Sequence, residues 1–380
     1  MPTITYPLTH HVLAALAVAL IISFIATPPV KRFAQRVGAI DVPKDNRRIH
    51  KVPIPRLGGL AIFIGFVISV VIWADINREI QGVLLGALLI VSIGAIDDIV
   101  PLRSWQKLGG QIVAALIPIF WGGVVIDLIS NPNIFAESSY LPFGFMAIPL
   151  TVIWIVGITN AVNLIDGLDG LAVGVSTIAS LTMLVIALLV TADANVALVL
   201  AALAGACLGF MPYNLNPAKI FMGDTGALLL GYLLSTMSII GLFKFYAIIS
   251  FAVPVMALAL PILDTLFAIL RRLAKGQSPM TPDRGHLHHR LIDMGFSQKQ
   301  AVFIIYLISG FLGMIAVIMT SSGEIRIIFT GLAFLVVALF VLVAFRGTLL
   351  KPAGKCDCTC EEETKPEAES PTGGDSHDAD

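Results

Sequence analysis

The sequence predicts an all-α polytopic integral membrane protein of about eleven transmembrane helices, with the N-terminus outside and the C-terminus in the cytoplasm. Of its 380 residues, 57% are hydrophobic and only 13% are charged, whereas a soluble globular domain carries about 25% charged residues. The mean hydropathy is +0.90. Apolar runs close to the roughly 20 residues needed to cross a bilayer recur along the whole chain.

The apolar runs place the eleven helices in order, and the basic residues orient them. The expected helix centres are residues 20, 65, 88, 117, 152, 180, 203, 234, 258, 310 and 335. With the connections numbered in order, the odd connections and the C-terminal tail hold 21 of the 24 Lys and Arg residues. The even side holds only Arg78, Lys244 and Arg326. Because positive charge stays in the cytoplasm, this split gives the orientation and supports an odd number of helices.

The chain divides into a membrane-embedded domain, residues 1–350, and an acidic tail, residues 351–380. The first apolar run follows no basic segment and precedes a basic loop, so we expect a retained span and not a cleaved signal peptide. The tail is polar, acidic and rich in Pro, so we expect it to be disordered. Its "CDCTC" thiols could bind a soft metal, although a solvated tail is the favoured interpretation. Cys207 lies in an apolar run and is expected in the core.

The acidic residues outside the tail gather on the predicted cytoplasmic side. Asp97 and Asp98 end the third helix, Asp166 and Asp169 fall in the fifth connection, and Asp224 falls in the seventh. An Asp at the bilayer centre costs roughly 2.5–3.5 kcal/mol, so these side chains should border water near the membrane face. Their clustering predicts a common cation-binding or phosphate-handling site.

The stretch "NAVNLIDGLDGL", residues 160–171, spaces polar residues three apart between apolar runs. Taken as one helix, Asn160, Asn163, Asp166 and Asp169 would fan over half the cylinder and line one wall of a polar cleft. The simpler alternative is a polar helix end followed by a Gly-rich turn.

Two other motifs carry carboxylates. In "IFMGDTGALLLGYLL", Asp224 sits where a helix begins, and free amides there favour phosphate, although Asp224 could instead be a plain N-cap. In "GAIDDIVPL", Asp97 and Asp98 diverge by about 100° on a helix. We therefore expect one to face the site while the other supports it, and their proximity to raise one pKa to suit a general base. The alternative is a pair of solvated loop acids.

Two basic loops carry histidines. In "TPDRGHLHHRLIDMGFSQKQAV", His286 and His289 would share a helical face, while His288 would point elsewhere. Near Arg284 this histidine loop suits a diphosphate better than zinc, and a basic interfacial helix is the alternative. In "DNRRIHKVPIPRLGGL", Arg48 and His50 belong to a cluster that could receive anionic headgroups or a lipid phosphate. The residues alone do not decide between these.

Five motifs in order resemble the polyprenyl-phosphate N-acetylhexosamine-1-phosphate transferase family. They are "DNRRIHKVPIPRLGGLAI", "GAIDDI", "NAVNLIDGLDGLA", "FMGDTGALLLGYLL" and "PDRGHLHHRLIDMGFSQKQAV". The resemblance runs from about residue 36 to 310. "RGHLHHRL" is similar to the branch that transfers GlcNAc-1-phosphate to undecaprenyl phosphate in teichoic-acid or O-antigen synthesis. Phospho-MurNAc-pentapeptide transferase, the alternative, usually has consecutive histidines where Leu287 stands here.

The resemblance implies a role for each matched position. The implied metal ligands are Asp224 and Asn163. The implied catalytic residues are Asp97, Asp98, Asp166 and His289. The implied substrate-binding residues are Lys107, Asn160, Asp169, His286, His288, Arg284, Arg48 and His50. The acidic tail lies outside the family pattern and receives no role.

The resemblance also implies the cofactor and partners. We expect Mg²⁺, with Mn²⁺ as a substitute, and two substrates: undecaprenyl phosphate from the bilayer and UDP-N-acetylglucosamine from the cytosol. We expect a multi-pass protein of the inner (plasma) membrane with a cytoplasmic active site and no nucleic-acid partner; a homodimer is left open. An ion-coupled transporter is the alternative of another class, but it would place carboxylates near the bilayer midplane on paired broken helices.

Overall fold

The computed structural model describes residues 6–42, 53–130, 140–191, 193–243, 252–274, 276, 286–321, 323–324, 326–333 and 335. In this part of the chain the long helices are α1 (Tyr6–Val37), α2 (Gly58–Trp73), α3 (Arg78–Ile99), α4 (Ser104–Gly122), α5 (Ala147–Ile165), α6 (Leu171–Ile186), α7 (Ala194–Asn214), α8 (Gly223–Ser238), α10 (Ala259–Ala274) and α12 (Gln298–Thr320). The shorter pieces are α9 (Ala252–Ala257), α11 (Leu287–Asp293), η1 (Gly144–Met146), and the π-helical turns η2 (Ala187–Thr191) and η3 (Ile239–Phe243).

The architecture is that of an all-α polytopic membrane protein. Seven helices of the described chain are long and apolar enough to span a bilayer, and they begin at Leu8, Arg78, Gly144, Leu171, Ala194, Gly223 and Gln298. A helix covers each of the first ten predicted centres except residue 258, which falls on the break between α9 and α10. The ninth predicted helix is therefore two helices, with Leu258 between them. The eleventh centre, residue 335, is helical.

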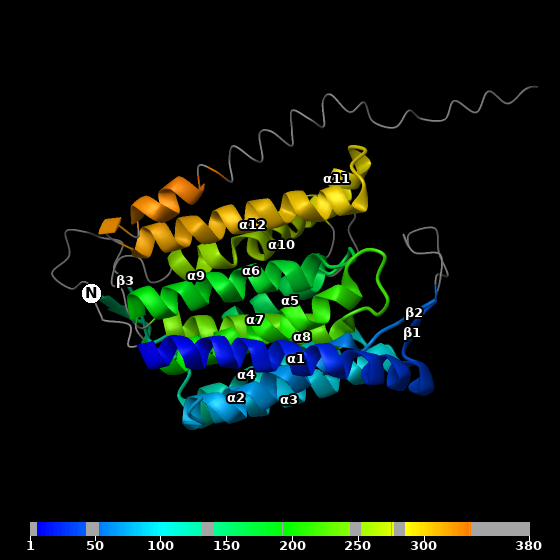
Figure 1. Ribbon diagram of the computed structural model, residues 1–380, viewed down its shortest axis with the longest axis horizontal. Coiled ribbons are helices and arrows are strands. Elements are labelled where there is room, and N and C mark those ends of the chain that lie inside the picture. Colours follow the sequence, from blue (N-terminus) through cyan, green and yellow to red (C-terminus); the bar gives the residue numbers. More distant parts are fainter. Residues whose placement is uncertain are drawn as a thin grey trace, which may run out of the picture.

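Two small hairpins interrupt the helices and were not predicted. β1 (Ile40–Asp41) pairs antiparallel with β2 (Ile54–Pro55), and β3 (Leu128–Ser130) pairs antiparallel with β4 (Tyr140–Pro142). Their strands are too short to show a period of two in the sequence. In Figure 1 the start of α1 and β3 lie at one end of the bundle, whereas β1, β2 and α11 lie at the other.

Several helices begin with a side-chain cap that the sequence provides locally. Asn77 accepts a hydrogen bond from the amide of Ile80 at the start of α3, and Asp193 accepts one from the amide of Val196 at the start of α7. Ser297 and Gln300 form a reciprocal capping box at the start of α12. Each such cap satisfies a backbone donor that the helix itself leaves unpaired. The start of α8, in contrast, has no side-chain cap from its own neighbours in sequence.

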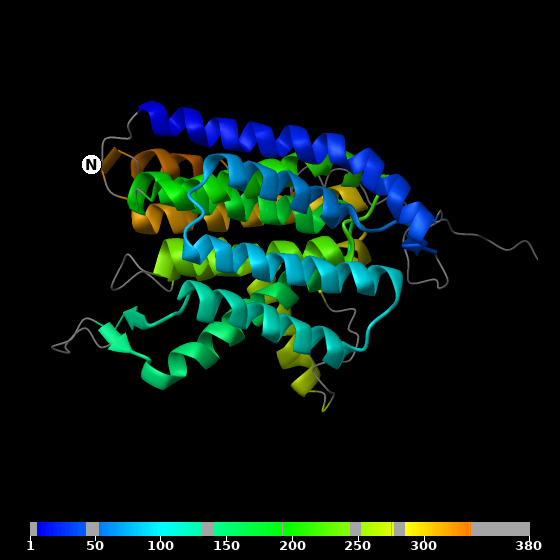
Figure 2. The ribbon, with the colours of Figure 1, turned by 90° about the horizontal axis from the view of Figure 1, so that it is seen from below.

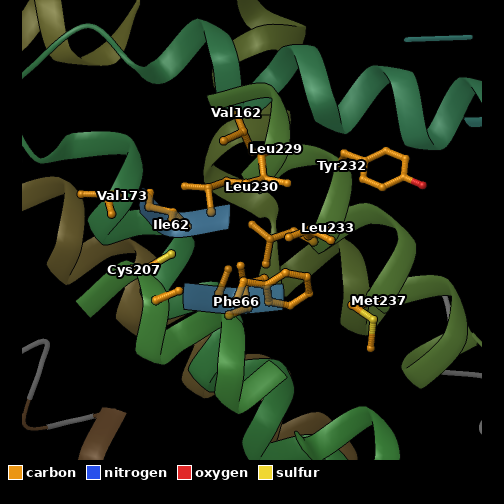
Figure 3. Packing of buried hydrophobic residues seen from close by; sticks show 14 of the residues in the cluster. Ile62, Phe66, Val162, Val173, Cys207, Leu229, Leu230, Tyr232, Leu233 and Met237 are labelled. Carbon is orange, nitrogen blue, oxygen red and sulfur yellow. The ribbon is translucent and has the colours of Figure 1, made fainter. Parts of the chain in front are cut away.

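Helix α8 is the centre of the bundle. In its most apolar stretch 89% of the residues are buried, against 28% for α1. It packs against α2, α3, α5 and α6 (Figure 2). In Figure 3 the leucines of α8 lie over Ile62 and Phe66 of α2, and the Tyr232 ring points away from them. A helix that is apolar on all sides must be surrounded in this way, and α8 consequently has little freedom to move.

Glycines let α1 and α7 approach each other closely. Gly205 and Gly209 of α7 lie against the carbonyl oxygens of Leu16 and Leu20 on α1, where a Cβ would overlap them. This is the spacing of small residues, four apart, that typically brings transmembrane helix backbones together. Gly157 of α5, in contrast, faces open space.

Replacing Gly205 with Ala should therefore destabilise the protein by about 1–3 kcal/mol, because the new methyl group pushes α1 away from α7. Thermal melting of the purified protein in detergent measures the effect. The matched control is Gly157→Ala, which should melt at or slightly above the wild-type temperature, because Ala favours a helix and meets no neighbour. Equal melting of Gly205→Ala and wild type would show that the two helices do not depend on this contact.

Candidate functional site

All members of the predicted acidic cluster except Asp97 line one cavity of about 780 Å³, formed with residues of β1 and β2 at the end of the bundle that also holds α11. The predicted site residues on its wall are Asp98, Asn163, Asp166, Asp169, Asp224 and His289. They come from α3, α5, the turn after α5, α8 and α11. Segments far apart in sequence therefore meet around one space, as the one-sided distribution of acids predicts.

Lys107 joins two of the acids. Its Nζ lies 2.7 Å from Asp97 Oδ2 and 2.5 Å from Asp224 Oδ2, so one ammonium group from α4 bridges carboxylates of α3 and α8. The other oxygen of Asp97 accepts a hydrogen bond from the amide of Leu102 at 2.7 Å. The other oxygen of Asp224 accepts one from Asn163 Nδ2 at 3.2 Å. Asn163 thus lies beside Asp224, as expected, whereas the contact of Lys107 with these acids was not predicted; substrate binding by Lys107 stays a prediction.

The polar stretch after residue 160 is not one helix, so the expectation of a fan over a single cylinder is wrong. α5 ends at Ile165, Asp166 is its C-cap, and residues 166–170 form a turn. The turn ends at Gly170, whose φ of +80° is a left-handed conformation that Gly adopts without strain. The turn carries Asp166 and Asp169 into the cavity.

Asn160 does not line the cavity with Asn163. Its amide pairs reciprocally with that of Gln111 on α4, with Nδ2 donating to Gln111 Oε1 at 2.5 Å and Oδ1 accepting from Nε2 at 3.3 Å. Gln111 is buried. This pair holds α4 against α5 one turn before the site, and substrate contact by Asn160 stays a prediction.

Asp166 and Asp169 have opposite surroundings. Burial, together with the neighbouring carboxylates of Asp224, Asp98 and Asp169, raises the pKa of the partly buried Asp166 to about 7. Asp169 Oδ2 instead accepts hydrogen bonds from Asn216 Nδ2 at 2.9 Å and from the amide of Ala218 at 3.0 Å. Asp166 is therefore the carboxylate that would gain most from a cation.

The end of α7 and the loop before α8 supply cavity-wall residues that were not predicted. Asn214 accepts a hydrogen bond from the amide of Gly170 and donates one to the carbonyl of Ile220. Asn216, which binds Asp169, also donates to Gln298 Oε1 at 2.6 Å. A signal was present, because "YNLNPAK" is a polar interruption directly before the Asp224 motif. Both Asn side chains brace the turn that holds Asp169.

The start of α8 differs from the expectation of free amides. Asp98 Oδ1 accepts a hydrogen bond from the amide of Asp224 at 3.0 Å, and Oδ2 accepts from the amide of Thr225 at 3.0 Å and from its hydroxyl at 2.6 Å. These amides are therefore committed to a carboxylate of the protein itself. Asp224 is not an N-cap either, because it lies within the first turn of the helix.

The three histidines take three different environments, and the shared face expected for His286 and His289 is wrong. His286 precedes α11 in an extended conformation, and its Nδ1 lies 2.8 Å from Asp264 Oδ2. His288 is buried behind Gly167, whose missing Cβ leaves room for the ring. Burial lowers the pKa of His288 to about 4. His289 alone of the three lines the cavity.

Three predicted substrate-binding residues, Arg48, His50 and Arg284, lie outside the described residues, as does the tail. Arg56, which belongs to the same connection as Arg48 and His50, is described. Its Nη2 lies 2.7 Å from Asp41 Oδ1, and both side chains line the cavity.

The sequence of residues 80–242 matches the family described as glycosyl transferase family 4. The chain is 44% identical over 317 residues to a probable undecaprenyl-phosphate N-acetylglucosaminyl 1-phosphate transferase of Bacillus subtilis, covering 83% of this chain and 86% of that protein. It is 36% identical over 366 residues to the decaprenyl-phosphate N-acetylglucosaminephosphotransferase of Mycolicibacterium smegmatis, covering 89% of each.

A phospho-N-acetylmuramoyl-pentapeptide-transferase of Desulfitobacterium hafniense is 33% identical over 342 residues, covering 83% of this chain and 99% of that protein. All three similarities extend over most of the membrane-embedded region.

The raised pKa of Asp166 predicts how stability changes with pH. Its ordinary value is 3.8 and its folded value is about 7. The stability that protonated Asp166 contributes is therefore complete below pH 4 and is lost as the pH rises through 7. Asp166→Asn removes the charge, so in the presence of a chelator it should melt a few degrees above wild type at pH 8 and near wild type at pH 4.

Melting of both proteins at the two pH values is the measurement. Asp293→Asn, at an exposed position on α11, is the control and should show no pH-dependent difference. An Asp166→Asn difference of the same size at both pH values would contradict the raised pKa.

Proposed function

The chain belongs to glycosyl transferase family 4, and from this premise we propose that it transfers N-acetylglucosamine 1-phosphate from UDP-N-acetylglucosamine to undecaprenyl phosphate and releases UMP. This would be the first membrane step of a cell-wall or surface glycan. The 44% identity to the Bacillus subtilis protein over most of both chains supports this choice of substrates. The observation that carries the proposal is the bridge from Asp97 through Lys107 to Asp224, beside a cavity lined by Asp166 and His289.

The cavity has the two chemistries that a nucleotide sugar and a lipid phosphate require. Basic side chains of Lys31, Arg56 and Lys219 lie on its wall together with the acids. Phosphate oxygens are held by such cations and by metal ions bound to carboxylates. We assign the nucleotide to the side of Asp169 and the diphosphate to the region between Asp224 and His289.

The donor set fits Mg²⁺. Within the described residues no three His, Cys, Asp or Glu side chains form a ready metal cage. Mg²⁺ typically uses one or two carboxylates together with substrate phosphates and water, so it does not need one. We propose Asp224 as the direct ligand, with the oxygens of Asn163 or Asp166 beside it, and Mn²⁺ as a substitute. When bound, the ion would neutralise charge on the phosphoryl oxygens.

The protein's task in the reaction is positioning. An oxygen of the lipid phosphate attacks the phosphorus next to the sugar; the new P–O bond forms while the bond to UMP breaks, and UMP leaves with the electron pair. The second pKa of a phosphate is near 6, so the attacking group is mostly a dianion at pH 7 and needs little help from a base. Asp97 would orient it through Lys107, and no covalent enzyme intermediate is required.

We place the cavity on the cytoplasmic face, with the N-terminus outside. The distribution of Lys and Arg supports this orientation. The grouping of the site at the end that holds β1, β2 and α11 is compatible with it (Figure 1). This one-ended arrangement also disfavours a transporter, whose carboxylates would lie near the bilayer midplane.

The substrate is tested by UMP release from purified protein with polyprenyl phosphate and Mg²⁺. UDP-N-acetylglucosamine should support turnover and UDP-MurNAc-pentapeptide should not. The reverse preference would move the chain to the peptidoglycan enzyme, to which the Desulfitobacterium relative belongs by name. If neither UDP-sugar gives UMP, the transferase proposal is refuted.

Asp224→Asn should abolish transfer and leave the protein folded, because the variant keeps the shape of the side chain but loses the charge that would hold the metal. UMP release and thermal melting are the two measurements. Asp75→Asn is the matched control, because only the backbone of Asp75 is hydrogen-bonded to Asn195 and the residue lies away from the cavity. Wild-type turnover by Asp224→Asn would remove Asp224 from the site.

His289→Ala should lower turnover about 100-fold or more, the smaller end of the effect of a positioned general acid, while the Mg²⁺ concentration for half-maximal activity stays the same. The expected reason is that His289 meets the diphosphate and not the metal. A magnesium titration of the residual activity is the measurement. A collapse of the magnesium affinity would instead make His289 part of the metal site.

A further inference from the structure

Asp98 occupies an unusual place for a side chain of the site. Its side chain is buried, with the residue 7% exposed, and its carboxylate lies beneath the first turn of α8. Both oxygens accept hydrogen bonds there: Oδ1 from the amide of Asp224, and Oδ2 from the amide and the hydroxyl of Thr225. One acid of α3 thus satisfies two backbone donors of a helix that begins 125 residues later in the chain.

These contacts replace the cap that α8 lacks. Its N-cap position, Met222, makes no side-chain cap hydrogen bond. The first amides of a helix need acceptors, and the positive end of the helix dipole favours a negative charge. A buried carboxylate conversely needs donors. Asp98 and the start of α8 therefore satisfy each other, and neither is stable in this position without the other.

The surrounding glycines are fitted to this contact. A Cβ at Gly223, which has a φ of +71°, would overlap the Asp98 carboxylate. A Cβ at Gly94, one helical turn before Asp98, would lie 2.5 Å from the Cα of Thr225. Both glycines thus let the α3 carboxylate pass under the backbone of α8 at hydrogen-bonding distance.

We infer that Asp98 is a positioning residue: it caps α8 from α3, fixes the place of Asp224 in the cavity, and does not serve as the base toward the lipid phosphate. The inference rests on the proposed function, since it concerns the proposed ligand Asp224. Although Asp98 borders the cavity, its two oxygens hold three donors, and taking a proton would release the helix that carries Asp224. Asp97, paired with Lys107, remains the acid that can orient a substrate.

The test uses the full-length protein with Asp98→Asn, Thr225→Val and the double variant. The side chain of Thr225 is buried, is not among the residues that line the cavity, and donates its hydroxyl to Asp98, so Thr225→Val removes a contact of Asp98 without removing a group of the cavity wall. Both single variants should raise the Mg²⁺ concentration for half-maximal activity about 10-fold, the scale of losing support for a metal ligand. The double variant should change little beyond Asp98→Asn, because both changes remove one interaction.

Two further readouts separate positioning from proton transfer. The first is the pH profile of kcat/KM, which should keep its acidic limb in Asp98→Asn. The second is thermal melting: both single variants should melt below wild type, and the double variant should melt little below Asp98→Asn. Thr177→Val is the matched control, because it is the same substitution in a buried helix away from the cavity, where the hydroxyl donates to the backbone carbonyl of Val173 and not to a carboxylate. It should leave the magnesium titration unchanged.

The inference is overturned if Thr225→Val titrates magnesium like wild type while Asp98→Asn loses the acidic limb, since that pattern belongs to a base. Additive effects of the two changes on the melting temperature would also overturn it. If wild-type protein releases no UMP, the proposed function fails, but non-additive melting would still establish Asp98 as the cap of α8.

Discussion

The hydrogen bonds from the first turn of α8 to the Asp98 carboxylate are the constraint on which the site depends. A carboxylate and a helix end are both costly to bury alone. Together they fix the relative height of α3 and α8, and with it the distance between Asp97 and Asp224. Lys107 can bridge those two acids only because this height is fixed. A sliding of either helix by one residue, about 1.5 Å along the axis, would break the bridge.

The apolar bundle makes that constraint rigid. α8 is surrounded by α2, α3, α5 and α6, so it cannot tilt without opening the core. Close approach is achieved with glycine on several faces: Gly59 of α2 meets the backbone of Gly226, and Gly231 meets the backbone of Thr159. Small residues bring helices together in lipid, and the same close packing therefore also holds the geometry of the candidate site.

The sequence predicts the helices and the grouping of the acids better than it predicts their partners. Apolar run length sets helix positions directly, and the cost of charge in lipid forces the acids to one end. Prediction from the sequence fails where a local structure depends on contacts with segments that are far away in the chain. The turn after Ile165 follows from Gly170 in a left-handed conformation, and the position of His286 outside α11 follows from its contact with Asp264. Neither contact has a periodic signature.

The carboxylates of the cavity are alike in sequence but not in the folded protein. Asp98 is held by a helix end, Asp97 and Asp224 by Lys107, and Asp169 by Asn216. For Asp166 the causes that shift its pKa include burial and three other acids but no hydrogen-bond donor, and Arg56 offsets them only in part. A divalent cation placed between Asp166 and Asp224 would relieve that repulsion and satisfy Asp166 at once. Asp97, Asp98, Asp169 and Asp224 each have a donor among the described residues, so Asp166 is the acid of this group at which the proposed cation would compensate the most charge.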